Sequence, residues 1–412
     1  MQTNLADFIR DTAEGREADA ILRKCVHCGF CNATCPTYQL LGDELDGPRG
    51  RIYLIKQALE GGEVTQKTQL HLDRCLTCRA CETTCPSGVE YGRLVDIGRN
   101  VVEQRVTRGP WQALQRAALS AVLPRTRLFG ALLAAGRALR PLLPGKLASK
   151  VPDAGSPAGA WPAPRHARRM VALAGCVQPA ISPAINAAAA RVLDQLGISL
   201  VEAPAGGCCG GLRFHLNRQE EGRQDMRALI DAWWPLVESG AEAFLMTASG
   251  CGTTVKEYGH MLKDDPVYAQ RAARVSSMTL DLAEVLANER AQIAKLACGR
   301  AGIAGEKAAF HSPCSLQHGQ QIRGLAESVL EAAGYELTDV PDAHLCCGSA
   351  GTYSILQPEL SSRLRVNKLA ALQSGAPTWI ATANIGCLTQ LQSGTATPVE
   401  HWIQLLERRM TQ

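Results

Sequence analysis

One cysteine pattern, repeated within the first hundred residues, constrains this chain more than any other feature of its sequence. Each copy has the spacing C-x2-C-x2-C-x3-C-P, and the 412-residue chain holds 17 cysteines in all. The two runs are Cys25, Cys28, Cys31, Cys35-Pro36 and Cys75, Cys78, Cys81, Cys85-Pro86. Because the thiolate form of cysteine is a metal ligand, two matching runs of closely spaced cysteines predict metal sites.

The spacing of each run is that of bacterial two-cluster ferredoxins, in which thiolates hold [4Fe–4S] cubes. Three closely spaced cysteines wrap one cube, and the fourth, on extended backbone before proline, reaches the neighbouring cube. Paired C-x2-C is also zinc spacing, so two structural zinc sites are the alternative, but two full copies ending in Cys-Pro favour clusters. The predicted ligand sets are Cys25, Cys28, Cys31 and Cys85 for one cluster, and Cys75, Cys78, Cys81 and Cys35 for the other.

The bulk composition and the N-terminus narrow the class of protein. A net charge of +4 is too small to favour nucleic acid as a partner, and 46% apolar with 20% charged residues is typical of globular proteins. Residues Met1 to Lys24 lack the apolar core of a signal peptide, and the chain has no uninterrupted apolar run long enough for a transmembrane helix. We therefore expect a cytoplasmic protein whose cysteines bind metal rather than form disulfides.

A chain of this length is expected to contain several domains, of which residues 1–104 form the cluster domain. The two cysteine runs are separated by 39 residues, more than a small ferredoxin uses. Apolar side chains recur at helical spacing over Arg49–Leu59, after a helix start at Gly47-Pro48. A mainly α-helical ferredoxin domain is therefore predicted.

Residues 105–165 form a basic connection. Residues 104–152 carry nine Arg or Lys and no acidic residue, with amphipathic helices predicted over Trp111–Leu123 and Leu128–Leu139. Such segments suit peripheral contact with an anionic membrane surface or an acidic partner, and the alternative is a pair of packing helices with solvated arginines. Pro152–Pro164, rich in Pro, Ala and Gly, is predicted to be a flexible linker.

The remainder is an internal repeat, with copies at residues 166–296 and 297–412. In each copy a single cysteine is followed after 31 residues by a Cys-Cys-Gly (CCG) sequence, and a later cysteine closes the copy. The four positions are Cys176, Cys208, Cys209 and Cys251 in the first copy, and Cys314, Cys346, Cys347 and Cys387 in the second.

Strand and helix patterns alternate in the same order in both copies. Strands end at the single cysteine, lead to the CCG pair and precede the closing cysteine, with helices between them. The predicted helices are Pro183–Leu196 and Gln219–Val237 in the first copy, and Ile322–Ala333 and Pro358–Leu372 in the second. This order predicts α/β CCG domains built from parallel βαβ units. Because ligands gather at the carboxyl ends of parallel strands, the cysteines of each copy are expected to converge there.

Four converging cysteines suit a metal cluster, a redox dithiol or simple packing. Recurrence of the set in two copies argues against chance packing, and a vicinal pair suits a polynuclear cluster. Gly210 and Gly348, which follow the pairs, are expected to allow a positive φ or close backbone approach. Cys298 lies outside every pattern, and His215 and His311 are interpreted as structural histidines that are able to donate to sulfur.

With two ferredoxin runs followed by two CCG domains, the chain resembles the iron–sulfur subunits of membrane-associated flavin dehydrogenases and heterodisulfide reductases. Within that group it is most similar to the iron–sulfur subunit of bacterial glycolate oxidase. The resemblance covers nearly the whole chain. It is carried by Cys25-Val-His-Cys-Gly-Phe-Cys31, Gly42-Asp-Glu-Leu-Asp-Gly-Pro-Arg-Gly-Arg51, Thr247-Ala-Ser-Gly-Cys251 and His344-Leu-Cys-Cys-Gly-Ser-Ala-Gly-Thr352.

The resemblance implies an electron-transfer subunit with two [4Fe–4S] clusters, and FAD on a partner dehydrogenase subunit only. No dinucleotide-binding, phosphate-loop or Ser-His-Asp signature is recognisable, so substrate chemistry is expected on that partner. We expect glycolate oxidation to glyoxylate there, with electrons passing through this chain toward a quinone-level acceptor. The alternatives are a subunit of a lactate or glycerol 3-phosphate dehydrogenase, or a heterodisulfide-reductase-like thiol–disulfide enzyme.

The CCG domains depart from the related pattern. Many relatives close each repeat with C-x2-C, whereas Ala248 and Asn384 stand at those positions here, and Ser312 replaces a cysteine of some relatives. These differences argue against a double-cubane arrangement. One further cluster in one or both CCG domains, or a vestigial set of thiols, stays open.

Overall fold

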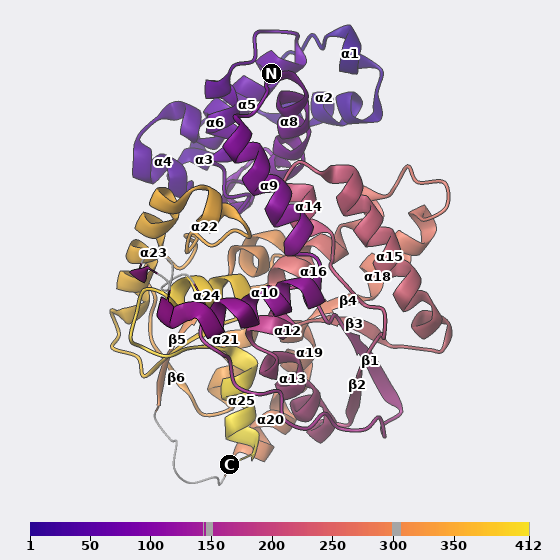
Figure 1. Cartoon of the computed structure of the whole chain (residues 1–412), viewed down its shortest axis with the longest axis vertical. Coiled ribbons are helices and arrows are strands. Elements are labelled where there is room, and N and C mark those ends of the chain that lie inside the picture. Colours follow the sequence, from indigo (N-terminus) through magenta and orange to yellow (C-terminus); the bar gives the residue numbers. More distant parts are fainter. Residues whose placement is uncertain (143, 146–150, 299–305, 412) are drawn as a thin grey trace. The chain divides into compact units, whose positions relative to one another are not determined.

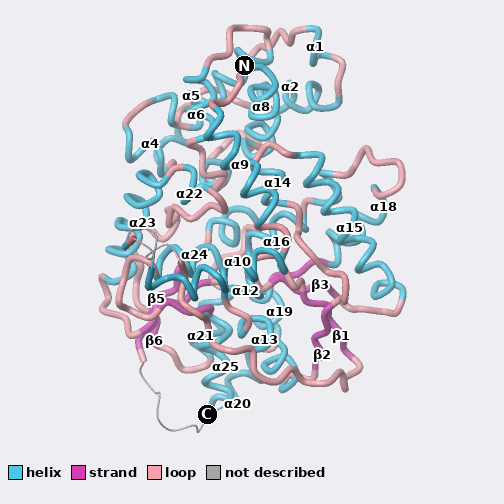
Figure 2. The backbone as a smooth tube through the Cα atoms, in the orientation of Figure 1, coloured by secondary structure: helices cyan, strands magenta, loops and turns pink. Residues whose placement is uncertain are grey.

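A computed structural model of the chain describes residues 1–142, 144–145, 151–298 and 306–411. Its residues group into two units. The first unit contains residues 1–117 and 344–364, and the second contains residues 118–343 and 365–412. Figure 1 labels the elements, and Figure 2 shows that helices predominate throughout the described chain. All the described strands belong to the second unit.

The first unit is helical, as the sequence predicts for a ferredoxin domain of this kind. Its core is formed by apolar side chains of α2, α5 and α8, among them the fully buried Leu22, Ile55 and Leu94. Pro48 occupies the first turn of α5, where a missing backbone N–H costs nothing. The elements are α1 (Asp7–Arg10), α2 (Ala13–Lys24), α3 (Phe30–Ala33), α4 (Pro36–Leu41), η1 (Glu44–Asp46), α5 (Pro48–Leu59), α6 (Gln66–Asp73), α7 (Ala80–Thr84), α8 (Tyr91–Arg105) and α22 (Tyr353–Leu356).

The described part of the basic connection contains α9 (Pro110–Val122) and α10 (Thr126–Leu139), followed by the short helix η2 (Arg140–Leu142). The break between them falls at Pro124, as the sequence predicts. Within the described residues, no single helix has both the length and the apolar character needed to cross a membrane. Residues Pro110–Val122 and Thr126–Leu142 meet those requirements only as a pair, bent by 110°.

The second unit contains two four-stranded parallel sheets of the same topology. The strand orders are β2-β1-β3-β4 and β6-β5-β7-β8. The central strands pair with Met170 opposite Ala243 in one sheet and Ala308 opposite Trp379 in the other. The strands are β1 (Arg168–Ala172), β2 (Ile198–Glu202), β3 (Ala243–Met246), β4 (Thr279–Asp281), β5 (Lys307–His311), β6 (Glu336–Leu337), β7 (Trp379–Thr382) and β8 (Val399–His401). Parallel βαβ units in two repeated copies are thus confirmed.

The fourth strand of each sheet, β4 or β8, is absent from the sequence-based prediction. Each contains only three residues, too few to show a periodic pattern. The helix predicted from Ile322 begins later, at Leu325, because Gly324 adopts a left-handed conformation with φ 72° before it. The helices are α12 (Gln178–Ile181), α13 (Ala184–Gln195), α14 (Gly211–His215), α15 (Gln219–Glu238), α16 (Ser249–Lys256), α17 (Tyr258–Met261), α18 (Ala269–Met278), α19 (Leu282–Asn288), α20 (Arg290–Ala297), η3 (Ser315–Gly319), α21 (Leu325–Ala332), α23 (Pro358–Gln373, divided between the units), α24 (Ile385–Gln392) and α25 (Trp402–Thr411).

The two sheets share one hydrophobic core. Helix α13 of the first repeat packs against α25 of the second, and buried Leu193 and Ile403 belong to the same cluster of side chains. Two hydrogen bonds join the second repeat to the first near the ends of the sheets: His401 Nε2 lies 2.8 Å from the Thr247 carbonyl, and Gln320 Nε2 donates to Asp281 at 3.1 Å. The repeats of the sequence are therefore packed as one body in the second unit.

The segment predicted as a flexible linker has no regular secondary structure, but it is attached to the second unit. Arg137 donates to the carbonyls of Pro152 and Asp153, at 3.0 and 2.8 Å. Arg191 donates to the carbonyl of Ala160, and the Trp161 indole donates to the Leu200 carbonyl at 2.9 Å. Trp161 also packs against the shared core. The composition of the segment predicts a loop, but it does not predict these hydrogen bonds to the second unit.

Candidate metal centres

The two cysteine runs of the first unit fold into matching loops. In each loop the residue before the second cysteine has a positive φ, 57° at His27 and 51° at Thr77, and so does the residue after it, Gly29 or Arg79. These turns fold the backbone around the first three cysteines. The fourth cysteine, Cys35 or Cys85, is extended before its proline, as predicted.

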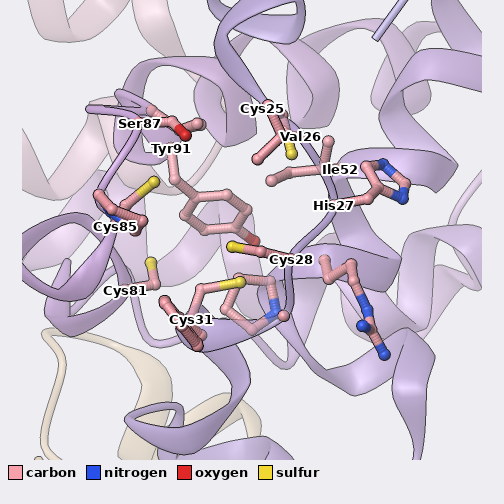
Figure 3. A pocket seen from close by; sticks show the side chains of 16 residues that line it. Cys25, Val26, His27, Cys28, Cys31, Ile52, Cys81, Cys85, Ser87 and Tyr91 are labelled. Carbon is pink, nitrogen blue, oxygen red and sulfur yellow. The ribbon is translucent and has the colours of Figure 1, made fainter.

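The first hollow of the unit brings together the predicted set Cys25, Cys28, Cys31 and Cys85. Figure 3 shows the sulfurs of these residues facing a common space, with Tyr91 beside them. Cys28 is exposed, and its neighbours Val26 and Phe30 are 68% and 60% exposed. Burial, followed by repulsion from the neighbouring cysteines, raises the pKa of Cys31 to about 11. The first hollow therefore opens to solvent beside Cys28.

The second hollow brings together the predicted set Cys75, Cys78, Cys81 and Cys35. Three of these thiols are buried, and burial raises the pKa of Cys81 well above its ordinary value. Tyr91 Oη donates to Cys75 Sγ at 3.6 Å, and the Thr77 backbone N–H donates to the same sulfur at 3.4 Å. Cys81 and Tyr91 also line the first hollow, so the two sites are adjacent.

A buried charge network lies behind the second hollow. Asp46 is fully buried and contacts Arg51 Nη2 at 3.5 Å, His71 Nδ1 at 3.0 Å and Arg74 Nη1 at 2.8 Å. Arg51 is itself 1% exposed, lines the hollow and donates to the Thr37 hydroxyl at 3.2 Å. Since unpaired buried charges are costly, the network holds a cation permanently beside the second hollow.

The donor sets fit [4Fe–4S] clusters. Each hollow holds the four free thiols of its predicted set, drawn from both runs, which is the ligand number and type that such a cluster needs. The raised pKa values of Cys31 and Cys81 describe thiols without metal, and a bound cation shifts such groups to thiolates.

In the second unit, the four cysteines of the first CCG repeat converge at the carboxyl ends of the strands. Their thiols form a chain of hydrogen bonds from Cys176 to Cys208, Cys209 and Cys251. The hydrogen bond with Cys208, together with burial, raises the pKa of Cys176 well above its ordinary value. For Cys209, the hydrogen bond with Cys208 lowers the pKa, but the one with Cys251 and burial outweigh it.

The cysteines of the second repeat are divided between the units. Cys346 and Cys347 are buried in the first unit, and Cys314 and Cys387 lie in the second. Asn384 Nδ2 donates to Cys387 Sγ at 3.5 Å. A ring nitrogen of His311 lies within 4.8 Å of the same sulfur. His311 Nδ1 is 3.0 Å from the Thr382 hydroxyl, and burial lowers its pKa to about 3, so the imidazole is neutral.

The glycine after each vicinal pair is required, as the sequence predicts. Gly210 has φ 80°, and a Cβ there would lie 2.4 Å from the Gly222 carbonyl oxygen. Gly348 has φ 83°, and its Cβ would lie 2.6 Å from the Ser361 carbonyl oxygen. Their backbone N–H groups donate to Cys208 Sγ and Cys346 Sγ, each at 3.4 Å.

Several residues around the hollows escape sequence reasoning. Tyr91 and Arg51 belong to helices. In the sequence, Tyr91 resembles an ordinary core residue of its helix and Arg51 resembles an ordinary surface residue. For Arg51, the sequence offers one indication: it lies in Gly42–Arg51, one of the segments that carry the family resemblance, although the resemblance assigns it no role. Cys298 is exposed and outside every site.

Comparison with known proteins assigns the same three parts of the chain. Residues 21–89 match the family described as a 4Fe-4S dicluster domain, and residues 170–256 and 308–392 match the cysteine-rich CCG domain. The glycolate oxidase iron-sulfur subunit of Escherichia coli K12 is 57% identical, with 100% of this chain and 99% of that protein covered. The probable glycolate oxidase iron-sulfur subunit of Bacillus subtilis 168 is 31% identical over 94% of this chain and 92% of its own. Lactate utilization protein A of Bacillus licheniformis is 25% identical over 52% of this chain and 87% of its own.

The positive φ and close backbone contact of Gly210, after the first CCG pair, lead to a prediction about stability. Gly210→Ala should lower the free energy of unfolding by more than Gly240→Ala, because both glycines have positive φ but only Gly210 meets a carbonyl oxygen. The shared φ penalty is about 1–3 kcal/mol. Thermal unfolding of both variants measures the difference, and equal losses would show that the loop relaxes around the added methyl group.

Proposed function

We propose that this chain carries electrons from a flavoprotein that oxidises glycolate. The premise is its family: the chain belongs to the glycolate oxidase iron–sulfur subunits. The observation that carries this proposal is the pair of adjacent four-cysteine hollows in a chain 57% identical to such a subunit over its whole length. The final acceptor in this proposal is at the level of a quinone.

The residues of the chain hold and shield the clusters rather than transform a substrate. We assign Cys25, Cys28, Cys31 and Cys85 to the first cluster, in the first hollow, and Cys75, Cys78, Cys81 and Cys35 to the second cluster, in the second hollow. When bound, each [4Fe–4S] cluster takes up and releases one electron. The exposed edge at Cys28 offers the first hollow to a partner, and the buried wall of the second hollow excludes water.

The thiol–disulfide enzyme is disfavoured by the cysteine environments. Such chemistry needs thiolates of low pKa in accessible positions. In the first CCG repeat, Cys176, Cys208 and Cys209 are buried, and the pKa of each is raised. Buried, neutral thiols are instead suited to a metal that replaces their protons.

The proposal is tested by purifying a tagged chain from its own cells. A flavin-containing dehydrogenase should co-purify, and the complex should reduce a quinone analogue with glycolate faster than with D-lactate or glycerol 3-phosphate. A preference for lactate would assign the chain to a lactate dehydrogenase. Purification without a flavoprotein would contradict the proposal.

The crossed ligand sets make a spectroscopic prediction. Cys35→Ser should alter the same EPR signal as Cys78→Ser, whereas Cys28→Ser should alter the other signal. Cys298→Ser, in an exposed thiol outside both hollows, is the matched control and should change neither. If Cys35→Ser and Cys28→Ser alter the same signal, the fourth cysteine serves its own run and the assignment is wrong.

We further propose that the CCG cysteines bind iron in at least one repeat. The set Cys176, Cys208, Cys209 and Cys251 forms one hydrogen-bonded chain of thiols, the first three of them buried, and the set Cys314, Cys346, Cys347 and Cys387 recurs at equivalent positions in the sequence. A cluster there would extend the electron path beyond the ferredoxin region.

Iron content tests this second assignment. The two ferredoxin clusters account for about eight iron atoms at four per cube, so anaerobically purified protein should contain clearly more. Cys209→Ser or Cys347→Ser should lower the count, and Cys298→Ser should not. A count of about eight in the wild type and in both variants would leave the repeats without iron.

We propose that one apolar face of α10 and η2 makes peripheral contact with a membrane. Leu128, Leu132, Leu139 and Leu142 are 41–81% exposed, at spacings that place them along one side of the helix. Arg125 and Arg127 are exposed at its start. Other arginines of the basic connection are engaged within the protein: Arg108 and Arg116 pair with Asp73, at 2.6 and 3.0 Å. Apolar insertion therefore contributes more here than charge.

Vesicle binding tests this face. The assembled complex should bind anionic vesicles, and Leu132→Ser with Leu139→Ser should weaken binding about a hundredfold or more, because each buried leucine contributes about 1.5–3 kcal/mol. The control is Val267→Ser, at an apolar residue elsewhere in the second unit that is 68% exposed. High salt should weaken binding less than the double variant does, by about thirtyfold at most, since two arginines add about 1 kcal/mol each. Unchanged binding in the double variant would mean that the leucines pack against a protein.

A further inference from the structure

Helix α8 contacts the two cluster sites of the first unit in different ways. Tyr91 begins α8 and is 4% exposed, and its ring lines both hollows. Its hydroxyl donates to the sulfur of one cysteine of the second hollow, Cys75 Sγ, at 3.6 Å. A buried tyrosine hydroxyl needs a hydrogen-bond partner, and here the partner is a predicted cluster ligand.

Helix α8 holds Cys75 at two points. Two turns after Tyr91, Arg99 Nη2 donates to the Cys75 carbonyl at 2.7 Å and to the Leu72 carbonyl at 2.8 Å. Arg99 is buried, so this contact fixes the helix against the backbone of the second run. The hydroxyl of Tyr91 is thereby held at the sulfur rather than free to turn toward solvent.

The first run has no equivalent donor at the corresponding position. Tyr91 lies six residues after Cys85, and the residue six after Cys35 is Leu41, whose side chain cannot donate a hydrogen bond. An arginine lines each hollow, but the two differ in burial: the side chain of Arg49, at the first hollow, is 36% exposed, and that of Arg51, at the second, is 1% exposed. The repeated cysteine runs are thus similar as ligand sets and dissimilar in the polar groups around them.

Hydrogen bonds to cluster sulfurs are among the determinants of reduction potential. Reduction adds one negative charge, which is shared by the sulfurs, so a donor stabilises the reduced form more than the oxidised form and raises the potential. We propose that Tyr91 is a positioning residue that raises the reduction potential of the second cluster through Cys75 and leaves that of the first cluster unchanged. This inference rests on the proposed ligand assignment.

The test is a redox titration of the complex followed by EPR, with Tyr91→Phe compared with wild type. The phenylalanine keeps the ring that lines both hollows and removes only the hydroxyl. The midpoint potential of the signal that Cys35→Ser alters should fall, and that of the other signal should stay in place. The matched control is Tyr53→Phe, at an exposed tyrosine of α5 in edge contact with His27 beside the first hollow, which should shift neither.

A second replacement moves the potential in the opposite direction. Incorporation of 3-fluorotyrosine at position 91 keeps the shape of the side chain and makes the phenol a stronger donor, so the same midpoint should rise. This arm still decides the matter if Tyr91→Phe loses iron. An unmoved midpoint with fluorotyrosine, or a shift of the other signal, overturns the role of Tyr91. If Cys35→Ser alters the signal assigned to the first cluster, the ligand assignment fails instead.

Discussion

The first unit depends on the crossing of two cysteines. Cys35 lines the hollow of the second run, and Cys85 lines the hollow of the first. Each leaves its own loop on extended backbone because proline follows it, and α4 begins directly at Pro36. The crossing makes neither hollow complete without the other run. Helices α5 and α8, which carry Arg51 and Tyr91, pack together in the core behind both runs.

The ferredoxin sites and the first CCG repeat differ in the groups that are buried around their cysteines. In the ferredoxin region burial surrounds the second hollow with partners of fixed charge, such as the Asp46–Arg51 pair, and leaves Cys28 exposed at the edge of the first. In the first CCG repeat it encloses three of the four thiols, which are joined in a chain of hydrogen bonds. Both environments suit metal ligation better than thiol nucleophiles, which agrees with electron transfer as the function of the chain.

The second unit shows how a sequence repeat becomes a single body. Each repeat alone would leave α13 or α25 with an uncovered apolar face, and the pairing of these helices covers both. The hydrogen bonds of His401 with Thr247 and of Gln320 with Asp281 join the carboxyl ends of the two sheets. The domain boundaries expected at residues 166–296 and 297–412 remain a prediction, although the repeats share one core.

The sequence by itself determined the helical ferredoxin region, the two parallel sheets and the cysteines that face each hollow, because spacing, prolines and strand periodicity are local properties. It also predicted that Gly210 allows a positive φ or close backbone approach, and the structure has both at this position. Tertiary structure alone decided that Tyr91 meets Cys75, that Asp46 gathers three cationic or imidazole partners, and that Trp161 anchors the proposed linker. Most of these contacts join residues 16 to 39 positions apart, and no local pattern in a single sequence specifies such pairs.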